Sequence, residues 1–269
     1  MMTSTQPTMR IEFIVDDNPL YVLPFFEEYV RHYEGAFPIA RISLCPSMGR
    51  RSRFHLFKQL TALYGPLGMV NILTRLVKAK LFGLFPRKRG ALRYETLTQL
   101  CKAHKIPFSR IGNPNKQEYR IALAQRAPDL LVSVACPYIL KTTVLSIPSK
   151  GCINIHHAPL PKYRGMMPTF WQLFHQEESV GLTVHYMSDK VDEGIALLQE
   201  RLTIEPGESL DHLIGRAKRH GAHCMAEVFK RLATGGTTEI KLDNTQASYF
   251  TFPTTEQMLE FRRRGLRVL

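Results

Sequence analysis

The stretch DLLVSVA at residues 129–135 indicates the fold class more clearly than any other part of the sequence. It is short and almost continuously apolar, which is typical of a strand buried on both faces within a parallel sheet. The stretch GCINI at 151–155 has the same character and follows after one short connection. These two runs predict neighbouring strands at the centre of a sheet.

The rest of the chain alternates between strand-like and helix-like patterns. Further strands are predicted at 10–15, 38–44, 180–187 and 195–204, and helices at 18–35, 94–104, 116–126, around Pro168 and at 209–232. In the first helix, Asn18 is expected as the N-cap and Pro19 as the first helical residue. Strands alternating with helices predict an α/β domain with a mostly parallel sheet. No G-x-G-x-x-G follows the first strand, so the dinucleotide fingerprint is missing.

The composition predicts an ordered cytoplasmic protein. Apolar residues make up 44% of the 269 residues, and the five cysteines are scattered without a CxxC pair. Such cysteines are usually reduced core residues. The N-terminus has no apolar segment typical of a secretory signal, and there is no run of 18 apolar residues that would predict a spanning helix.

The net charge of +13 is concentrated in one segment. Residues 46–94 hold eleven Lys and Arg residues and no Asp or Glu. Within 64–90, helical spacing predicts a helix that Pro86 ends, with one apolar face made of Val70, Leu73, Leu76, Val77, Leu81 and Leu84. Such a face can pack on its own domain. With Arg87, Lys88 and Arg89 beside it, it can instead lie on an anionic membrane or line the route to a polyanionic acceptor.

The most polar connection, NIHHAPLPKYRG at 154–165, begins where a predicted strand ends. Ligands of open parallel sheets bind at the carboxyl ends of the strands, and Asn154 and His156 lie at such an end. The loop SDKVDEG at 188–194 adds Asp192. An amide and a protonated imidazole can stabilise an oxyanion while a carboxylate orients the imidazole or relays a proton, which suits acyl transfer.

Each of these three residues also has an ordinary structural explanation. Asn154 can cap a turn, His156 can be a buried histidine with its hydrogen bonds satisfied, and Asp192 can begin a hairpin turn before Gly194. Taken singly, the residues favour these explanations; their order along the chain favours a shared site.

That order resembles the folate-dependent formyltransferases, a superfamily that includes methionyl-tRNA, glycinamide ribonucleotide and sugar N-formyltransferases. Its pattern is a strand ending in Asn-x-His, a Leu-Pro-x-x-x-Gly loop, and a Gly-x-Thr strand that leads to an Asp-x-Gly turn. Here these are Asn154–His156, 160–165, 181–183 and 192–194. The similarity covers roughly residues 129–205, and it implies a Rossmann-like catalytic domain.

The resemblance implies a catalytic set of Asn154, His156 and Asp192, with 10-formyltetrahydrofolate as the formyl donor. Matching positions for the pterin of the donor are Tyr138, Leu140, Leu145, Met187, Ser188 and Val191. An apolar slot is what a flat heterocycle needs, although Leu140 and Val191 can equally be core residues. The implied organisation is a catalytic domain at 1–235, containing the basic helical insertion at 46–94, followed by a C-terminal tail at 236–269 packed on the body.

The predicted activity is transfer of a formyl group to a primary amine, and several alternatives stay open. The acceptor is expected to be a small-molecule or carrier-linked amine, with aminoacyl-tRNA less favoured because too few residues follow Glu205 for a further β-domain. Hydrolysis of the donor uses the same site. A non-catalytic protein that binds a membrane or RNA through 46–94 is the competing class. We expect no metal, and a cytoplasmic location with peripheral membrane attachment as the alternative.

Overall fold

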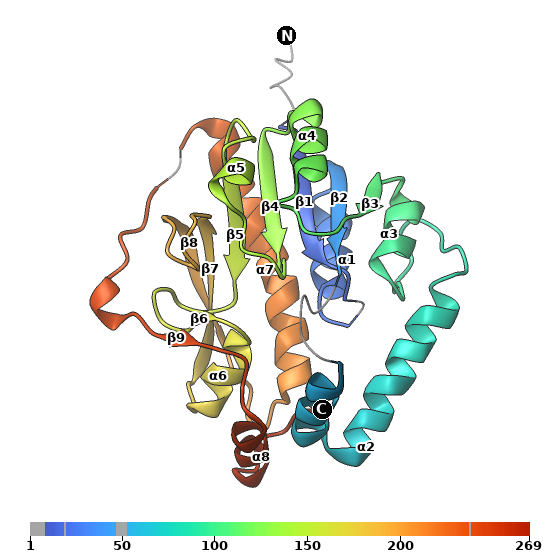
Figure 1. Cartoon of the computed structure of the whole chain (residues 1–269), viewed down its shortest axis with the longest axis vertical. Helices are drawn as coiled ribbons and strands as arrows, with labels where there is room; N and C mark the ends of the chain where they lie inside the picture. The colour runs from blue at the N-terminus through green and yellow to red at the C-terminus, as the bar shows by residue number, and fades with distance from the viewer. Residues whose placement is uncertain (1–8, 19, 47–52, 237) are drawn as a thin grey trace.

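The computed structural model describes residues 9–18, 20–46, 53–236 and 238–269. A seven-stranded sheet forms the centre, with strand order β3-β2-β1-β4-β5-β7-β8 (Figure 1). Its strands are β1 (Ile11–Asp16), β2 (Ile39–Cys45), β3 (Phe108–Arg110), β4 (Leu130–Val134), β5 (Cys152–His156), β7 (Ser179–Tyr186) and β8 (Ala196–Thr203). A two-stranded sheet pairs β6 (Arg164–Gly165) with β9 (Tyr249–Phe250).

The sheet is parallel from β3 to β5, and β7 and β8 add an antiparallel edge. The helices are α1 (Leu23–His32), α2 (Arg53–Phe82), α3 (Leu97–His104), α4 (Gln117–Arg126), α5 (Thr142–Leu145), α6 (Pro168–Phe174), α7 (Leu210–Thr234) and α8 (Thr255–Arg263). The predicted α/β class with a mostly parallel sheet is therefore confirmed, and the first strands follow the doubly wound order 3-2-1-4-5.

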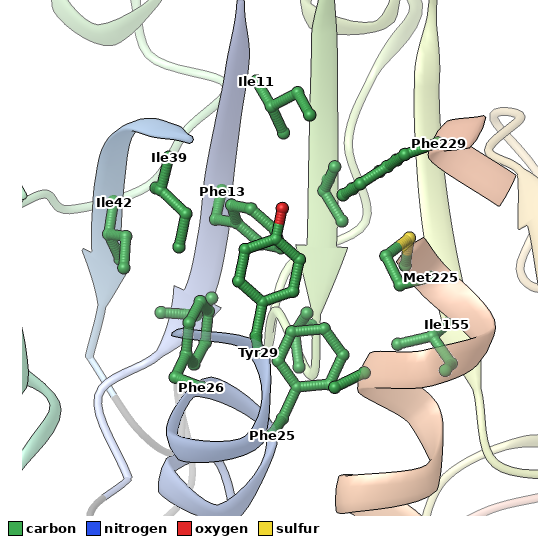
Figure 2. Close-up of a cluster of buried hydrophobic side chains, with 14 of the residues drawn as sticks. Ile11, Phe13, Phe25, Phe26, Tyr29, Ile39, Ile42, Ile155, Met225 and Phe229 are labelled. Atoms are coloured by element: carbon green, nitrogen blue, oxygen red, sulfur yellow. The ribbon is translucent and has the colours of Figure 1, made fainter. Parts of the chain in front are cut away.

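The central strands are apolar because both of their faces are buried. One face packs against α1 and α7, and Figure 2 shows Phe13, Phe25, Phe26, Tyr29 and Phe229 in this layer. The Phe13 ring lies 5.3 Å from Phe26 and 5.6 Å from Tyr29 in edge-to-face geometry, which stabilises aromatic pairs beyond their burial. The alternate residues of β1 and β4 face α4 and α5 in a second cluster. β5 pairs in parallel beside β4.

The C-terminal residues return to the body of the molecule. Met258 and Phe261 of α8 are fully buried in a cluster with Phe170 and Trp171 of α6. Phe170 and Phe261 stack with ring centroids 4.8 Å apart. The β9 strand lies beside β6, so the tail reaches the loop that follows β5.

The predicted start of the first helix is wrong. α1 begins at Leu23, with Val22 as the N-cap and Pro24 in the first turn. The side chain of Asn18 accepts a hydrogen bond from the backbone N–H of Leu20, which favours a turn at this point and not a helix. The predicted position of Pro19 lies outside the described residues.

The predicted helix in the basic segment is present, and the apolar face that the helical spacing predicted is not the face that packs on the protein. α2 bends where Gly65, at φ 69°, precedes Pro66, and it ends at Phe82 before reaching Pro86. The residues that pack on the body include Leu63, Met69, Ile72 and Ala79. All six residues of the predicted apolar face are exposed, by 38–80%, namely Val70, Leu73, Leu76, Val77, Leu81 and Leu84.

Candidate functional site

Asn154 and His156 point to the same face of β5 because side chains alternate along a strand. β7 runs antiparallel beside them, with Asn154 opposite His185 and His156 opposite Thr183. Gly181 of β7 allows the loop after β5 to approach closely, because a Cβ there would lie 2.3 Å from the backbone nitrogen of Pro159. The polar residues of the two strands therefore form one row beneath this loop.

His156 is 6% exposed and has an oxygen near each ring nitrogen. Nε2 lies 2.8 Å from the carbonyl oxygen of Tyr163 and therefore donates to it. Nδ1 lies 3.5 Å from Oδ2 of Asp192. Since the backbone carbonyl occupies Nε2, Nδ1 is the nitrogen able to exchange a proton with a ligand or with the carboxylate.

Asp192 comes from the loop after β7, which folds back over the row of polar side chains. Its Oδ2 accepts a hydrogen bond from the backbone N–H of Gly165 at 2.9 Å, and its Oδ1 lies 3.7 Å from Nε2 of His185. The backbone of Asp192 is left-handed, at φ 53°. The structure thus brings Asn154, His156 and Asp192 into one cluster.

His185 is a member of this cluster that the sequence analysis missed. Its Nδ1 donates to the carbonyl oxygen of Tyr186 at 2.8 Å, so its Nε2 accepts from the side-chain amide of Asn154 at 3.2 Å. Burial lowers the pKa of His185 to about 4, against the opposing effect of Asp192. A neutral His185 therefore orients the Asn154 amide. The sequence does contain a feature that could have identified His185. It is a polar residue two positions after Thr183, and therefore on the same face of an otherwise apolar strand.

We expect the stability of the protein to fall as the pH decreases from about 6.5 to about 4. Burial lowers the pKa of both His185 and His157, so the unfolded chain takes up protons in this range that the folded chain does not. Each such histidine contributes a slope of up to about 1.4 kcal/mol per pH unit. Urea unfolding at several pH values measures this slope.

The contribution of His185 is isolated by His185→Gln, which should make the loss of stability between pH 7 and pH 5 smaller. The control is His212→Gln, because the His212 side chain is 60% exposed. An unchanged pH slope in His185→Gln would contradict the buried neutral state of this histidine.

Four of the six residues predicted to contact the donor belong to the apolar cluster between the sheet and the helices α4 and α5. Tyr138, Leu145 and Met187 are partly buried at its edge, whereas Leu140 is fully buried within it. Leu140 is therefore a core residue in this structure and presents no surface to a ligand. Ser188 Oγ accepts from the backbone N–H of Lys190 and closes a turn, and Val191 is partly buried in the same loop.

A cavity of about 240 Å³ lies beside β3 and α4. Ser109, Ile111, Asn113, Lys116 and Tyr119 are among its lining residues, and none of them belongs to the predicted site. Ile111 and Tyr119 do pack in the same apolar cluster as Tyr138. None of the six residues predicted to contact the donor lines this cavity.

Two groups of potential metal ligands lie away from this site. One consists of Glu200, His220 and Cys224, and the other of Glu205, Glu208 and His212. In the first, Glu200 contacts Nε2 of His220 at 2.6 Å, and burial raises the pKa of the Cys224 thiol.

More than half of the sequence matches a known protein family. The sequence model of the formyl transferase family matches residues 84–229, more than half of the chain. A methionyl-tRNA formyltransferase of Synechococcus sp. (strain JA-3-3Ab) is 36% identical over 151 residues, which cover 56% of this chain and 47% of that protein. The chain spans about half the length of the curated relatives it matches.

Solved structures share the fold at low sequence identity. Glycinamide ribonucleotide transformylase 1 from Symbiobacterium toebii has a TM-score of 0.59 at 17% identity, covering 90% of this chain and 99% of that one. An N-formyltransferase from Helicobacter canadensis, in complex with folinic acid and dTDP-3-aminofucose, has a TM-score of 0.57 at 16% identity, covering 97% and 84%.

Proposed function

Because the chain belongs to the formyl transferase family, we propose that it transfers a formyl group from 10-formyltetrahydrofolate to a primary amine. The observation that carries this proposal is the convergence of Asn154, His156 and Asp192 from two separate segments, both within the matched region. Known relatives that are named as methionyl-tRNA formyltransferases, and a similar structure that holds folinic acid, support the donor and the class of acceptor.

The side chains of the site have separate roles in this reaction. The Asn154 amide and the Nδ1–H of a protonated His156 donate hydrogen bonds to the oxygen on which negative charge develops during acyl transfer. Asp192, 3.5 Å from His156, stabilises the protonated imidazole and accepts the proton that the attacking amine loses. His185 acts through Asn154 by holding its amide in one orientation.

The apolar edge of the cluster between the sheet and the helices α4 and α5 fits the proposed donor. Tyr138, Leu145 and Met187 leave part of their apolar surface uncovered, which suits a flat heterocycle. Val191 and Ser188 lie in the loop that carries Asp192, so donor binding and the position of this carboxylate would be linked. When bound, the donor supplies an electrophilic formyl carbon, and the chain's own residues supply the hydrogen bonds and the base.

The acceptor is proposed only as a primary amine, on a small molecule, a sugar or an aminoacyl-tRNA. Hydrolysis of the donor needs the same residues with water in place of the amine. A non-catalytic binding protein would have no need for the buried His156–Asp192 pair, so we favour the enzyme. We further propose that residues 1–235 form the catalytic unit with 236–269 packed on it, and that the protein acts in the cytoplasm.

The direct test is to incubate the protein with 10-formyltetrahydrofolate and a panel of primary amines, and to follow the release of tetrahydrofolate. Release that depends on an amine and yields the N-formyl product supports transfer. Release without any amine indicates hydrolysis. No release with sugar amines or with methionyl-tRNA, from a protein shown to be folded, would contradict the proposal.

Full activity is expected after exhaustive treatment with a chelator, because the proposed chemistry uses hydrogen bonds and a carboxylate and needs no Lewis acid. The measurement is tetrahydrofolate release before and after chelation, with metal analysis of the same samples. A loss of activity that only added zinc restores would contradict this prediction, and Glu200, His220 and Cys224 would then need to be tested by substitution.

A further inference from the structure

α2 has two apolar faces, and only one of them packs on the protein. Met69, Ile72 and Ala79 are buried by 93–96% against the body. The helix is held there by an ion pair between Arg75 and Asp211 at 2.9 Å and by packing against α8. The opposite side, which we call the outer face, is 48–88% exposed and consists of Leu67, Val70, Leu73, Val77 and Leu81, and Leu84, 80% exposed, follows the end of the helix.

The outer face is continuous along the helix. Its residues recur every three or four positions, so at roughly 100° per residue they share one side. Single exposed apolar residues are common on soluble proteins, but a contiguous stripe of this kind marks an interaction surface. Phe82 and Phe85, 49% and 63% exposed, extend it at the C-terminal end.

Basic residues border the outer face on both sides. By the same helical geometry, Lys78 and Lys80 lie on opposite flanks of the stripe, and Arg87 and Lys88 follow its end. All four are exposed, and within the described residues none of them forms an ion pair with a carboxylate. Long basic side chains beside an apolar stripe can place their charges at the level of lipid headgroups.

We propose that the outer face of α2 binds the surface of an anionic lipid membrane. Apolar burial at the acyl boundary and attraction of the flanking lysines to acidic headgroups are the two contributions that hold an interfacial helix. The surface is separate from the formyl-transfer site, and α2 lies outside the region matched by the family model. The proposal therefore stands whether or not the proposed reaction is correct.

Other occupants fit the outer face less well. A second copy would bring Lys78, Lys80, Arg87 and Lys88 close to the same charges of its partner. Single-stranded RNA favours aromatic stacking surfaces, whereas this stripe is mainly aliphatic.

The segment Phe57–Phe82 is long and apolar enough to cross a membrane. The sequence analysis did not predict this, because the chain has no run of 18 apolar residues. The break at Gly65, the buried inner face and the paired Arg75 favour a helix that lies on the membrane.

The test is co-sedimentation of the full chain with vesicles of phosphatidylcholine alone and of an equal mixture with phosphatidylglycerol. We expect binding to the mixed vesicles at low salt and release at high salt. The substitutions Val70→Gln, Leu73→Gln and Val77→Gln together should abolish binding without changing net charge. Lys78→Gln, Lys80→Gln, Arg87→Gln and Lys88→Gln should each weaken it about fivefold.

Matched controls separate the outer face from general properties of the protein. Ile121→Gln on α4 removes an apolar residue that is 49% exposed, close to the 48% of Leu73. A variant with Lys116, Lys141, Lys150 and Lys230 changed to Gln loses four positive charges away from α2, as many as the four basic substitutions remove when they are combined. Both controls should keep most of the binding.

Several results would overturn the proposal. One is a wild type that fails to bind vesicles or that binds both vesicle types equally well. Full vesicle binding by the α2 variants, or bound protein that high salt does not release, would also contradict it. Self-association of the wild type that the Val70, Leu73 and Val77 substitutions abolish, without lipid binding, would assign the face to a second copy.

Discussion

Replacing His156 with Ala should lower the turnover of formyl transfer by ~10²–10³-fold, and Asn154→Ala and Asp192→Ala should have effects of similar size. His156 and Asn154 are the proposed donors to the developing oxyanion, and Asp192 is the carboxylate 3.5 Å from His156. Because the three residues act as a unit, a double variant should lose little more than the worse single variant. The measurement is kcat from tetrahydrofolate release.

Controls for these variants come from the same surroundings. Asp189→Ala changes an exposed carboxylate in the loop that holds Asp192, and His212→Ala changes an exposed histidine on α7. Neither should alter kcat, and circular dichroism should show that all the variants are folded. Near-normal turnover in a folded His156→Ala protein would show that His156 has no part in the mechanism. The proposed role of Asp192, which acts on His156, would then also be wrong.

Gly194→Ala is expected to reduce both activity and stability. A Cβ at this position would lie 1.6 Å from the backbone oxygen of Tyr186 and 2.6 Å from its carbonyl carbon, and neither atom can move without disturbing β7. The loop that carries Asp192 would have to shift, which should lower kcat by tenfold or more. Overpacking of this kind costs about 1–3 kcal/mol of unfolding free energy.

The matched control is Gly112→Ala, because a Cβ there has no atom within 4 Å. Thermal unfolding and kcat should be close to wild type in this variant. If Gly194→Ala retained both properties, the position of the Asp192 loop would not depend on its close approach to β7.

Six strands of the central sheet could be predicted from the sequence, in their order of appearance, because buried strands produce apolar runs. The short strands β3, β6 and β9 were missed because two or three residues are too few to form such a run. The position of Asn154 and His156 could also be predicted, because they lie at the end of such a run. Boundaries were less accurate. α1 begins five residues after the predicted cap because the local hydrogen bond of the Asn18 side chain forms a turn there.

The order of Asn154, His156 and Asp192 along the chain predicted three members of the candidate site, and only the tertiary structure determined how they are arranged. His185 joins them because β7 pairs antiparallel with β5, which places His185 opposite Asn154. The sequence of one strand does not show which residues of the neighbouring strand it will face. Likewise, helical periodicity showed that α2 is amphipathic, but not which apolar side faces the protein. That depends on what lies beside the helix: Met69 and Ile72 are buried against the body, while Val70 and Leu73 are 62% and 48% exposed. Periodicity reports local geometry, whereas burial depends on residues distant in sequence.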